Sequence, residues 1–412
     1  MSLHFDELKE KRLFSLMSTQ AGALTASNGA ERFAELQNYL SAKLKEARSK
    51  NWKVVIIAGT NGKGETAHTL NTLALKQEIK VALWTSPHIL SLRERFCFEG
   101  EDLSYEELEL ALGDEFANQK KEGFFLGYYE TLFSVFLSLA LKKNPELLIL
   151  EVGLGGRFDA VNLMNPDLCL ITSIGRDHEE FLGRGHRKIL LEKLGVTRPQ
   201  VPLLTCLELS FQREVCREFT KTTQVPWIDL FEAELVTKTN DYSKRNRLLA
   251  LQAFKKLTGK TISLESLRSL SFKGRGETIQ ITDKTFFFIG AHNHDGVRKM
   301  VEGLKSGHLL NDFSCPFDTI LVSFSKRSIE EIEACVRLLA RDWRLANRVV
   351  LTSFEHNKAM DGKALSKFKG LVEFEADWKN ILPKLQGTVL VTGSYYFVGE
   401  VQRFLSSKLS SR

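Results

Sequence analysis

The chain has 412 residues, of which 43% are hydrophobic and 26% are charged, a composition ordinary for a globular protein and a length that favours two domains. Its 57 basic and 51 acidic side chains leave a formal net charge of +6, which by itself identifies no partner. Because no basic block is interleaved with aromatic residues, the sequence argues against a nucleic-acid surface.

The N-terminus and the most apolar stretch do not indicate a membrane protein. The opening sequence, MSLHFDELKEKRLF, has no apolar segment of signal-peptide length, and LFSVFLSLAL at 132–141 is too short to cross a bilayer. Six scattered cysteines without a C-x-x-C pair are typical of reduced thiols. We therefore expect a cytoplasmic monomer that uses neither a membrane nor a nucleic acid as partner.

Short apolar runs alternate with amphipathic stretches from residue 54 onwards. Nearly uninterrupted apolar runs are typical of parallel strands buried on both faces, with helices as the crossovers. One such helix is expected to begin at Lys63, because Ala67, Leu70 and Leu73 then share a face. The first series of predicted strands is 54–59, 80–86, 147–153, 168–175 and 201–205.

A second series of strands follows a polar stretch at 269–284, which shows no sustained period and predicts a linker. The helix expected within 328–343 repeats apolar residues at helical spacing. The later strands are 285–290, 318–325, 348–354 and 388–394. We therefore predict an α/β fold with a mostly parallel sheet in an N-terminal domain (1–272), a linker (273–284) and a smaller Rossmann-like α/β domain (285–412).

A glycine-rich turn between the first strand and the first helix predicts a phosphate loop. Its glycines let the backbone wrap round an anion with amide N–H groups turned inward. The helix N-terminus adds its dipole, and Lys63 adds a positive charge for the outer phosphates of ATP. Two residues rather than four separate Gly59 from Gly62, which argues against an ordinary GTPase or kinase. We assign this ATP site to Gly59, Thr60, Asn61, Gly62, Lys63, Gly64 and Thr66.

Further motifs follow the loop in a fixed order, several of them at strand ends. They are TSPH (85–88), LEVGLGGRFDAVN (150–162), TSIGRDHEEFLG (172–183), EKLGV (192–196), GRGE (274–277), GAHN (290–293) and VLVTGSYYFVGEV (389–401). Together they resemble the folylpolyglutamate synthase and dihydrofolate synthase family of the Mur-ligase superfamily. The resemblance covers roughly residues 50 to 300 and the C-terminal end, whereas the first fifty residues match poorly.

The resemblance implies a ligase that uses ATP to join glutamate to a pteroate or folate carboxylate through an acyl phosphate. Phosphorylation is chemically sensible because a carboxylate is a poor electrophile, and positioning and charge neutralisation then carry most of the catalysis. The implied partners are glutamate and a pterin or folate. The implied cofactors are ATP and Mg²⁺, with K⁺ as a further candidate. Both dihydropteroate and folate polyglutamates fit as acceptors.

By the resemblance, Ser86, Glu151 and His178 match the family's magnesium ligands. Each ends or follows a strand, so the three can meet at the carboxyl edge of the first sheet. Oxygen ligands such as those of Ser86 and Glu151 suit Mg²⁺, whereas an imidazole is less typical. Taken alone, the same residues could be a capping serine, a polar strand end and a hydrogen-bonded histidine.

Several other residues take roles from the family. Lys63, Lys193 and His292 are the expected catalytic residues, and Lys193 matches a lysine that the family carbamylates, although a helical lysine is more often simply solvated. Asn246 and Arg275 match residues that hold the nucleotide. The remaining two, Ser394 and Tyr395, match positions that line the glutamate pocket.

Three residues depart from the family pattern. Glu65 stands where the family has Ser or Thr, and Ile289 and His294 stand where it has Asp and Pro. At ~6 Å and an effective dielectric constant of ~20, a carboxylate costs roughly 3 kcal/mol against each phosphate charge. We therefore expect Glu65 to turn outward into solvent, where a helix N-terminus tolerates an acid.

Two other functions compete with the glutamate ligase. One is a related ligase that joins a different amino acid to a different carboxylate, against which the Gly-Lys-Gly loop counts. The other is a nucleotide-binding homologue that has lost catalysis, which Glu65 and Ile289 would favour.

Overall fold

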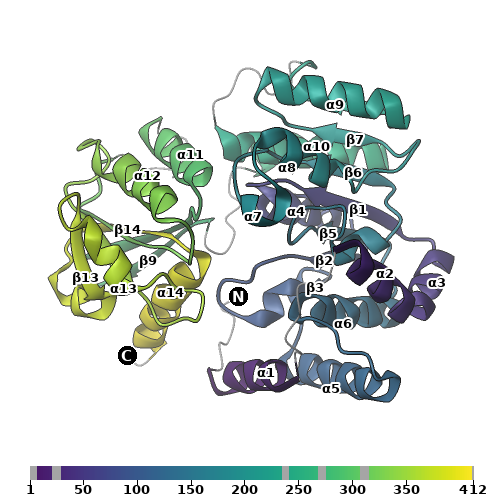
Figure 1. Ribbon diagram of the computed structural model, residues 1–412, viewed down its shortest axis with the longest axis horizontal. Helices are drawn as coiled ribbons and strands as arrows, with labels where there is room; N and C mark the ends of the chain where they lie inside the picture. Colours follow the sequence, from purple (N-terminus) through teal and green to yellow (C-terminus); the bar gives the residue numbers. More distant parts are fainter. Residues whose placement is uncertain (1–6, 21–28, 234–240, 268–274, 307–314, 411–412) are drawn as a thin grey trace. The chain divides into compact units, whose positions relative to one another are not determined.

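The computed structural model describes residues 7–20, 29–233, 241–267, 275–306 and 315–410. The chain divides into two compact units, one of Met1–Lys238 with Lys244–Arg268 (unit 1) and one of Thr239–Ser243 with Ser269–Arg412 (unit 2). Each unit is built on one sheet with helices packed against it (Figure 1). The α/β fold class predicted from the sequence is confirmed.

The sheet of unit 1 has eight strands in the order β4-β3-β2-β5-β1-β6-β7-β8. The six strands from β2 to β8 in this order are parallel, and only β3 and β4 are antiparallel to their neighbours. The strands are β1 (Lys53–Ala58), β2 (Val81–Trp84), β3 (Phe96–Phe98), β4 (Glu101–Asp102), β5 (Leu147–Glu151), β6 (Leu168–Ile171), β7 (Leu203–Thr205) and β8 (Trp227–Asp229). The five apolar runs predicted as strands here are all confirmed.

The helices of unit 1 cover this sheet, and the first three of them precede its first strand, β1, in the chain. They are α1 (Glu7–Gln20), α2 (Gly29–Tyr39), α3 (Ser41–Ser49), α4 (Lys63–Leu75), α5 (Tyr105–Glu122), α6 (Tyr128–Lys143), α7 (Glu179–Leu182), α8 (His186–Leu194), α9 (Ser210–Thr223) and α10 (Tyr242–Thr258). The apolar run 132–141 lies inside α6, where most side chains are buried in the protein core. Among the described residues no helix combines the length and apolarity needed to cross a membrane.

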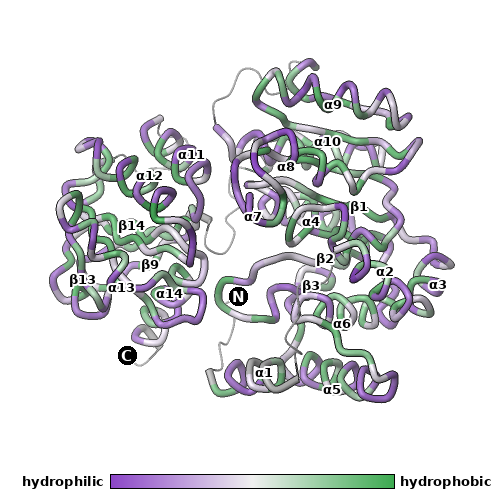
Figure 2. The backbone as a smooth tube through the Cα atoms, in the orientation of Figure 1, coloured by the Kyte–Doolittle hydropathy of each residue, from purple (hydrophilic) through white to green (hydrophobic). Residues whose placement is uncertain are grey.

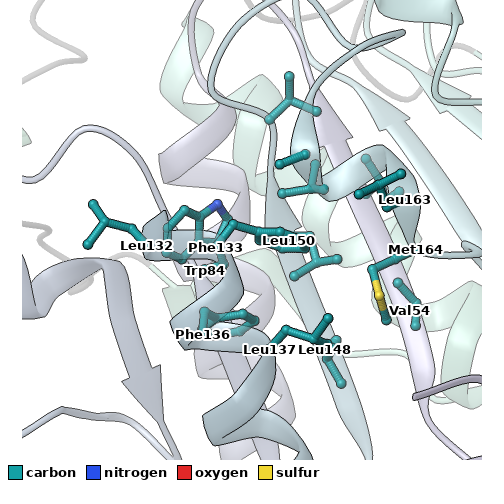
Figure 3. Packing of buried hydrophobic residues seen from close by; sticks show 14 of the residues in the cluster. Val54, Trp84, Leu132, Phe133, Phe136, Leu137, Leu148, Leu150, Leu163 and Met164 are labelled. Carbon is teal, nitrogen blue, oxygen red and sulfur yellow. The ribbon is translucent and has the colours of Figure 1, made fainter. Parts of the chain in front are cut away.

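The core of unit 1 is centred on Trp84, the last residue of β2, whose side chain is fully buried. Its ring lies 5.5 Å from the rings of Phe96, Tyr129 and Phe136 and 5.8 Å from that of Phe133. Figure 3 shows Trp84 beside two of these rings, which α6 contributes. Aromatic edges and faces therefore bind the sheet to α6.

The sheet of unit 2 has six strands in the order β13-β12-β11-β14-β10-β9, all parallel except β9. Helices α11 and α12 pack side by side, whereas α14 lies against β14, β10 and β9. Figure 2 shows hydrophobic residues concentrated along the strands of both sheets. The elements are β9 (Arg275–Ile281), β10 (Lys284–Gly290), α11 (His294–Lys305), β11 (Thr319–Ser323), α12 (Ile329–Ala340), β12 (Val349–Ser353), α13 (Gly362–Leu365), β13 (Glu373–Asp377), β14 (Thr388–Gly393) and α14 (Tyr395–Ser410).

Of the stretch 273–284, expected to be a linker, residues 273–274 lie outside the described residues and most of the rest belongs to the second sheet. Residues 275–281 form β9, which pairs antiparallel with β10 at the sheet edge. Its polar composition reflects one solvent-facing side, because an antiparallel edge strand needs only one apolar face. The strands β3, β4, β8 and β13 were also missed, since they are two to five residues long and lie toward the sheet edges.

The buried aromatic core predicts a clear difference between two phenylalanines of unit 1. Phe133 is fully buried, whereas Phe181 is 72% exposed. Phe133→Ala should lower the free energy of unfolding by about 3–5 kcal/mol, because it removes ring contacts and leaves a cavity. Phe181→Ala should change it by less than about 0.5 kcal/mol. Urea unfolding measures both, and equal losses would contradict the assignment of the core.

Candidate functional site

The phosphate loop (residues 59–62) joins β1 to α4 in a conformation that requires glycine at two positions. Gly59 has a φ of +152° and Gly62, which precedes the helix, a φ of +89°. A Cβ atom on Gly59 would lie 1.9 Å from Oγ1 of Thr172, and one on Gly62 would lie 2.4 Å from Oδ1 of Asn246. Both the backbone angles and the close neighbours therefore exclude larger residues.

The end of the neighbouring strand β6 holds the loop in place. The Thr60 N–H donates to the carbonyl of Ser173 at 2.7 Å. The carbonyl of Asn61 accepts from the hydroxyls of Thr172 at 2.7 Å and Ser173 at 2.9 Å. These bonds satisfy loop groups that would otherwise compete for the helix N-terminus, whose N–H groups are donors of the kind that bind an anion.

Lys63, the first residue of α4, returns its side chain to the loop. Its Nζ donates to the carbonyls of Gly59 at 3.0 Å and Thr60 at 3.2 Å. The ammonium group and the positive end of the helix dipole thus lie at the same turn. This arrangement has the charge and the donors that phosphate binding needs.

Two of the three predicted metal ligands are in contact. Ser86 follows β2 and Glu151 ends β5, and the Ser86 N–H donates to Oε2 of Glu151 at 3.0 Å. Glu151 is 2% exposed, so its carboxylate lies within the sheet edge rather than in solvent. One carboxylate and one hydroxyl are oxygen donors of the kind that Mg²⁺ accepts while keeping several waters.

The third predicted ligand, His178, lies in the loop after β6, directly before α7, and its side chain is 46% exposed. His178 has a φ of +53°. Its Nε2 lies 3.9 Å from Oδ2 of Asp177, and its Nδ1 lies 3.8 Å from Oε1 of Glu180. Within the described residues no group of three or more His, Cys, Asp or Glu side chains could hold a metal ion. In the sheet, β1 separates β6, which precedes His178, from β5, which ends at Glu151, so the strand order does not make His178 a neighbour of the Ser86–Glu151 pair.

Lys193 is buried, which excludes the alternative of a solvated helical lysine. The residue is 5% exposed on α8. Burial, and after it the charge of Lys63, lowers the pKa of its amine to about 7, while Asp177 and Asp159 act in the opposite direction. The amine is therefore largely uncharged at slightly alkaline pH, so it can act as a nucleophile.

Asp159 and Tyr129, which sequence reasoning did not place in the site, fix the backbone that follows Glu151. The Asp159 carboxylate accepts from the N–H groups of Gly153 and Leu154 at 2.9 and 3.0 Å. The Tyr129 hydroxyl lies 3.1 Å from Oδ1 of Asp159, and burial raises the pKa values of both groups. The motif GLGGRFDAVN contained Asp159, whereas Tyr129 comes from α6 and lies 30 positions away in the sequence, so no local pattern joined the two.

Glu65 does not turn into solvent, so that expectation is wrong. It is 6% exposed and points toward α10. Its Oε2 accepts from Nδ2 of Asn246 at 2.8 Å, and its Oε1 lies 3.5 Å from Nε of Arg247. Thr66, expected at the phosphates, is fully buried with its hydroxyl 3.5 Å from the Asn246 carbonyl. The start of α4 is therefore joined to α10.

Unit 2 gathers its predicted residues at the carboxyl ends of the adjacent strands β10 and β14. The rings of His292 and Tyr395 lie 5.2 Å apart, and the hydroxyl of Ser394 lies 2.7 Å from that of Ser325. Ile289 is 3% exposed and belongs to the core of this unit. His294 begins α11. The side chain of Arg275, the first residue of β9, lies outside the described part of the structure.

Comparison with known proteins agrees with this geometry. No family model matches the chain. It is 26% identical over 396 residues to a dihydrofolate synthase/folylpolyglutamate synthase of Bacillus subtilis, an alignment covering 85% of this chain and 89% of the relative. Two solved structures resemble it in fold.

One of these structures is the bifunctional folylpolyglutamate synthase/dihydrofolate synthase of Yersinia pestis complexed with AMPPNP and a manganese ion, at 23% identity and a TM-score of 0.76 over 97% of this chain and 98% of that one. The other is the FolC protein of Escherichia coli in complex with DHPP and ADP, at 21% identity and a TM-score of 0.73 over 94% of this chain and 100% of that one. At these identities the two structures establish the shared fold.

The lowered pKa of Lys193 predicts a pH dependence of stability. Between pH 7 and the ordinary lysine value of 10.5, the unfolded chain binds a proton that the folded chain has released, so stability rises with pH. The titration of Lys193 raises the free energy of unfolding by at most about 1.4 kcal/mol per pH unit. Urea unfolding of the wild type and Lys193→Met in CO₂-free buffer measures it, and the variant should lack this rise. Parallel pH profiles would contradict the burial of a titrating amine.

Proposed function

The chain belongs to the folylpolyglutamate synthase and dihydrofolate synthase family, and we propose that it is an ATP-dependent ligase that adds L-glutamate to dihydropteroate or folates. One observation carries the proposal: the phosphate loop and the Ser86–Glu151 pair follow strand ends of the unit 1 sheet, and the buried Lys193 of α8 is near enough to Lys63 for that charge to lower its pKa. The relatives named above supply the substrate class. The ligands bound in the two solved structures, ADP, AMPPNP, manganese and DHPP, support a nucleotide, a divalent metal and a small acceptor.

In the first step, a substrate carboxylate oxygen attacks the γ-phosphorus of ATP and ADP leaves. The loop N–H groups and Lys63 hold the phosphates, and the helix dipole of α4 stabilises their negative charge. The product is an acyl phosphate. In the second step, the glutamate amine attacks its carbonyl carbon, phosphate departs, and the amine loses a proton.

Ser86 and Glu151 would hold Mg²⁺, whose charge neutralises phosphate oxygens when it is bound. Glu151 is positioned for this by the Ser86 N–H and by the network of Asp159 and Tyr129 behind it. Rigid support of this kind keeps a ligand oxygen in place while the substrate changes charge.

Lys193 is proposed to be carbamylated, because its amine has the required protonation state. An uncharged Nζ can attack CO₂, forming an N–C bond and releasing a proton, whereas an ammonium group cannot. The pKa of about 7 places much of the amine in the reactive form near neutral pH. The resulting carbamate would lie within the electrostatic reach of Lys63, which disfavours the lysine cation but favours an anion.

On the acceptor side, we propose that His292, Ser394 and Tyr395 bind glutamate or orient its amine. Their support is the shared end of β10 and β14, and the burial of Ser394, which is 1% exposed. Asn246 and Arg275 are proposed to serve the nucleotide.

The activity predicts a specific product and a variant that loses it. With ATP, Mg²⁺, glutamate and either dihydropteroate or a folate, mass spectrometry should detect the glutamylated product together with phosphate. Lys63→Ala should reduce its formation by at least about a hundredfold, because the outer phosphates lose the loop cation. Lys188→Ala, an exposed lysine on α8, is the control and should keep the wild-type rate.

Three other outcomes would decide against this function. A product formed only with another amino acid would identify a divergent ligase. ATP binding with no product from any pteroate or amino acid would identify a non-catalytic nucleotide-binding homologue. Equal rates in Lys63→Ala and the wild type would remove the loop from the reaction.

The metal assignment predicts a change in magnesium dependence. Glu151→Gln keeps the shape of the side chain but removes its charge, so the Mg²⁺ concentration for half-maximal turnover should rise about tenfold or more. Glu180→Gln makes the same change on a 66% exposed side chain beside His178 and should leave it unaltered. Titration of Mg²⁺ at saturating ATP measures both, and coincident curves for Glu151→Gln and the wild type would show that Glu151 is no ligand.

A further inference from the structure

The side chain at position 65 connects the first turn of α4 to α10 through two residues far away in sequence. Glu65 accepts from Asn246 at 2.8 Å and lies 3.5 Å from Arg247. Arg247 in turn donates through Nη1 to the carbonyl of Leu267 at 2.7 Å. The carboxylate is 6% exposed and Asn246 is 5% exposed, so these are contacts of the interior rather than of a solvated surface.

A carboxylate at this position fixes which way the Asn246 amide faces. An ionised carboxylate only accepts hydrogen bonds, so the NH₂ group of Asn246 must face Glu65 and the amide oxygen must face the opposite side. A serine or threonine hydroxyl both donates and accepts, and would leave both amide orientations possible. Glu65 therefore removes an alternative that the hydroxyl residues of the family pattern would permit.

The amide that Glu65 orients lies directly against the phosphate loop. A Cβ atom on Gly62 would be 2.4 Å from Oδ1, 2.6 Å from Nδ2 and 2.7 Å from Cγ of Asn246. A side chain at position 62 would clash with the Asn246 amide, so only glycine fits there. Gly62 immediately precedes Lys63. A displacement of the Asn246 side chain would therefore shift the backbone that presents N–H groups to the phosphates.

Arg247 makes the buried charge compatible with that role. Its guanidinium compensates the carboxylate, and its bond to the Leu267 carbonyl holds it on the α10 side of Glu65. The charge of Glu65 is therefore paired away from the loop, which reduces its repulsion of a bound triphosphate.

We propose that Glu65 is a positioning residue for the nucleotide, acting through Asn246 to set the backbone at Gly62. The inference rests on the proposed ATP-dependent function and adds a residue to its site. Glu65 itself touches no substrate. It makes α10 part of the phosphate site, at a position where the family pattern has only a short hydroxyl side chain.

A double-mutant cycle on ATP binding tests this role, with calorimetry in the presence of Mg²⁺ as the measurement. Glu65→Ala and Asn246→Ala should each raise the Kd for ATP about tenfold, the size of one lost hydrogen bond to a charged group. The double variant should bind no more weakly than the weaker single variant, because both changes remove one coupled unit. Glu65→Gln should fall between, since it accepts from Asn246 but loses the charge facing Arg247.

Glu115→Ala is the matched control for a merely structural effect. Glu115 is another buried carboxylate of unit 1, 2% exposed and bonded to Lys43 at 2.7 Å. Its loss should lower the free energy of unfolding and leave the Kd for ATP unchanged. An ATP affinity of Glu65→Ala equal to that of the wild type, or fully additive effects in the double variant, would overturn the inference alone. A wild-type chain that binds no ATP would overturn the proposed function as well.

Discussion

The bonds between the phosphate loop and the end of β6 are the constraint on which the rest of the site depends. β1 lies between β5 and β6 in the sheet, so the loop that follows it has a strand end on either side. The hydroxyls of Thr172 and Ser173 close the loop because both donate a hydrogen bond to the Asn61 carbonyl. On the other side of β1, Glu151 ends β5 and accepts from the Ser86 N–H.

Burial of charge is the second constraint, and each buried group is compensated in a different way. Asp159 accepts from several backbone N–H groups, and Glu65 faces a guanidinium and an amide. For Lys193, burial lowers the pKa of the amine, which favours its uncharged form. An uncompensated charge in such a place would cost several kcal/mol. The third solution leaves an amine with a lowered pKa in the interior, which is the feature on which the proposed carbamylation rests.

The sequence was sufficient to predict the apolar parallel strands, because strands buried on both faces read as continuous hydrophobic runs. It failed for β9 and β13, where one face is polar, and for β3, β4 and β8, which are too short to show a period. The loop followed from the order of strand, glycine-rich turn and helix, whereas the assignment of Ser86 and Glu151 came from the family resemblance together with their places at strand ends. The direction of the Glu65 side chain could not be predicted from the sequence, because its partner Asn246 lies 181 positions away. No local pattern distinguishes a paired acidic side chain from a solvated one.

Two of the three departures from the family pattern, Ile289 and Glu65, have different physical meanings. Ile289 is an apolar residue in an apolar core, so its presence only removes a possible polar contact from unit 2. Glu65 brings a charge into the interior and could not be tolerated there without donors. Asn246 and Arg247 of α10 supply them, so the buried carboxylate is paired on both of its oxygens. The pairing joins the first turn of α4 to α10, which is the geometry that the proposed positioning role of Glu65 needs.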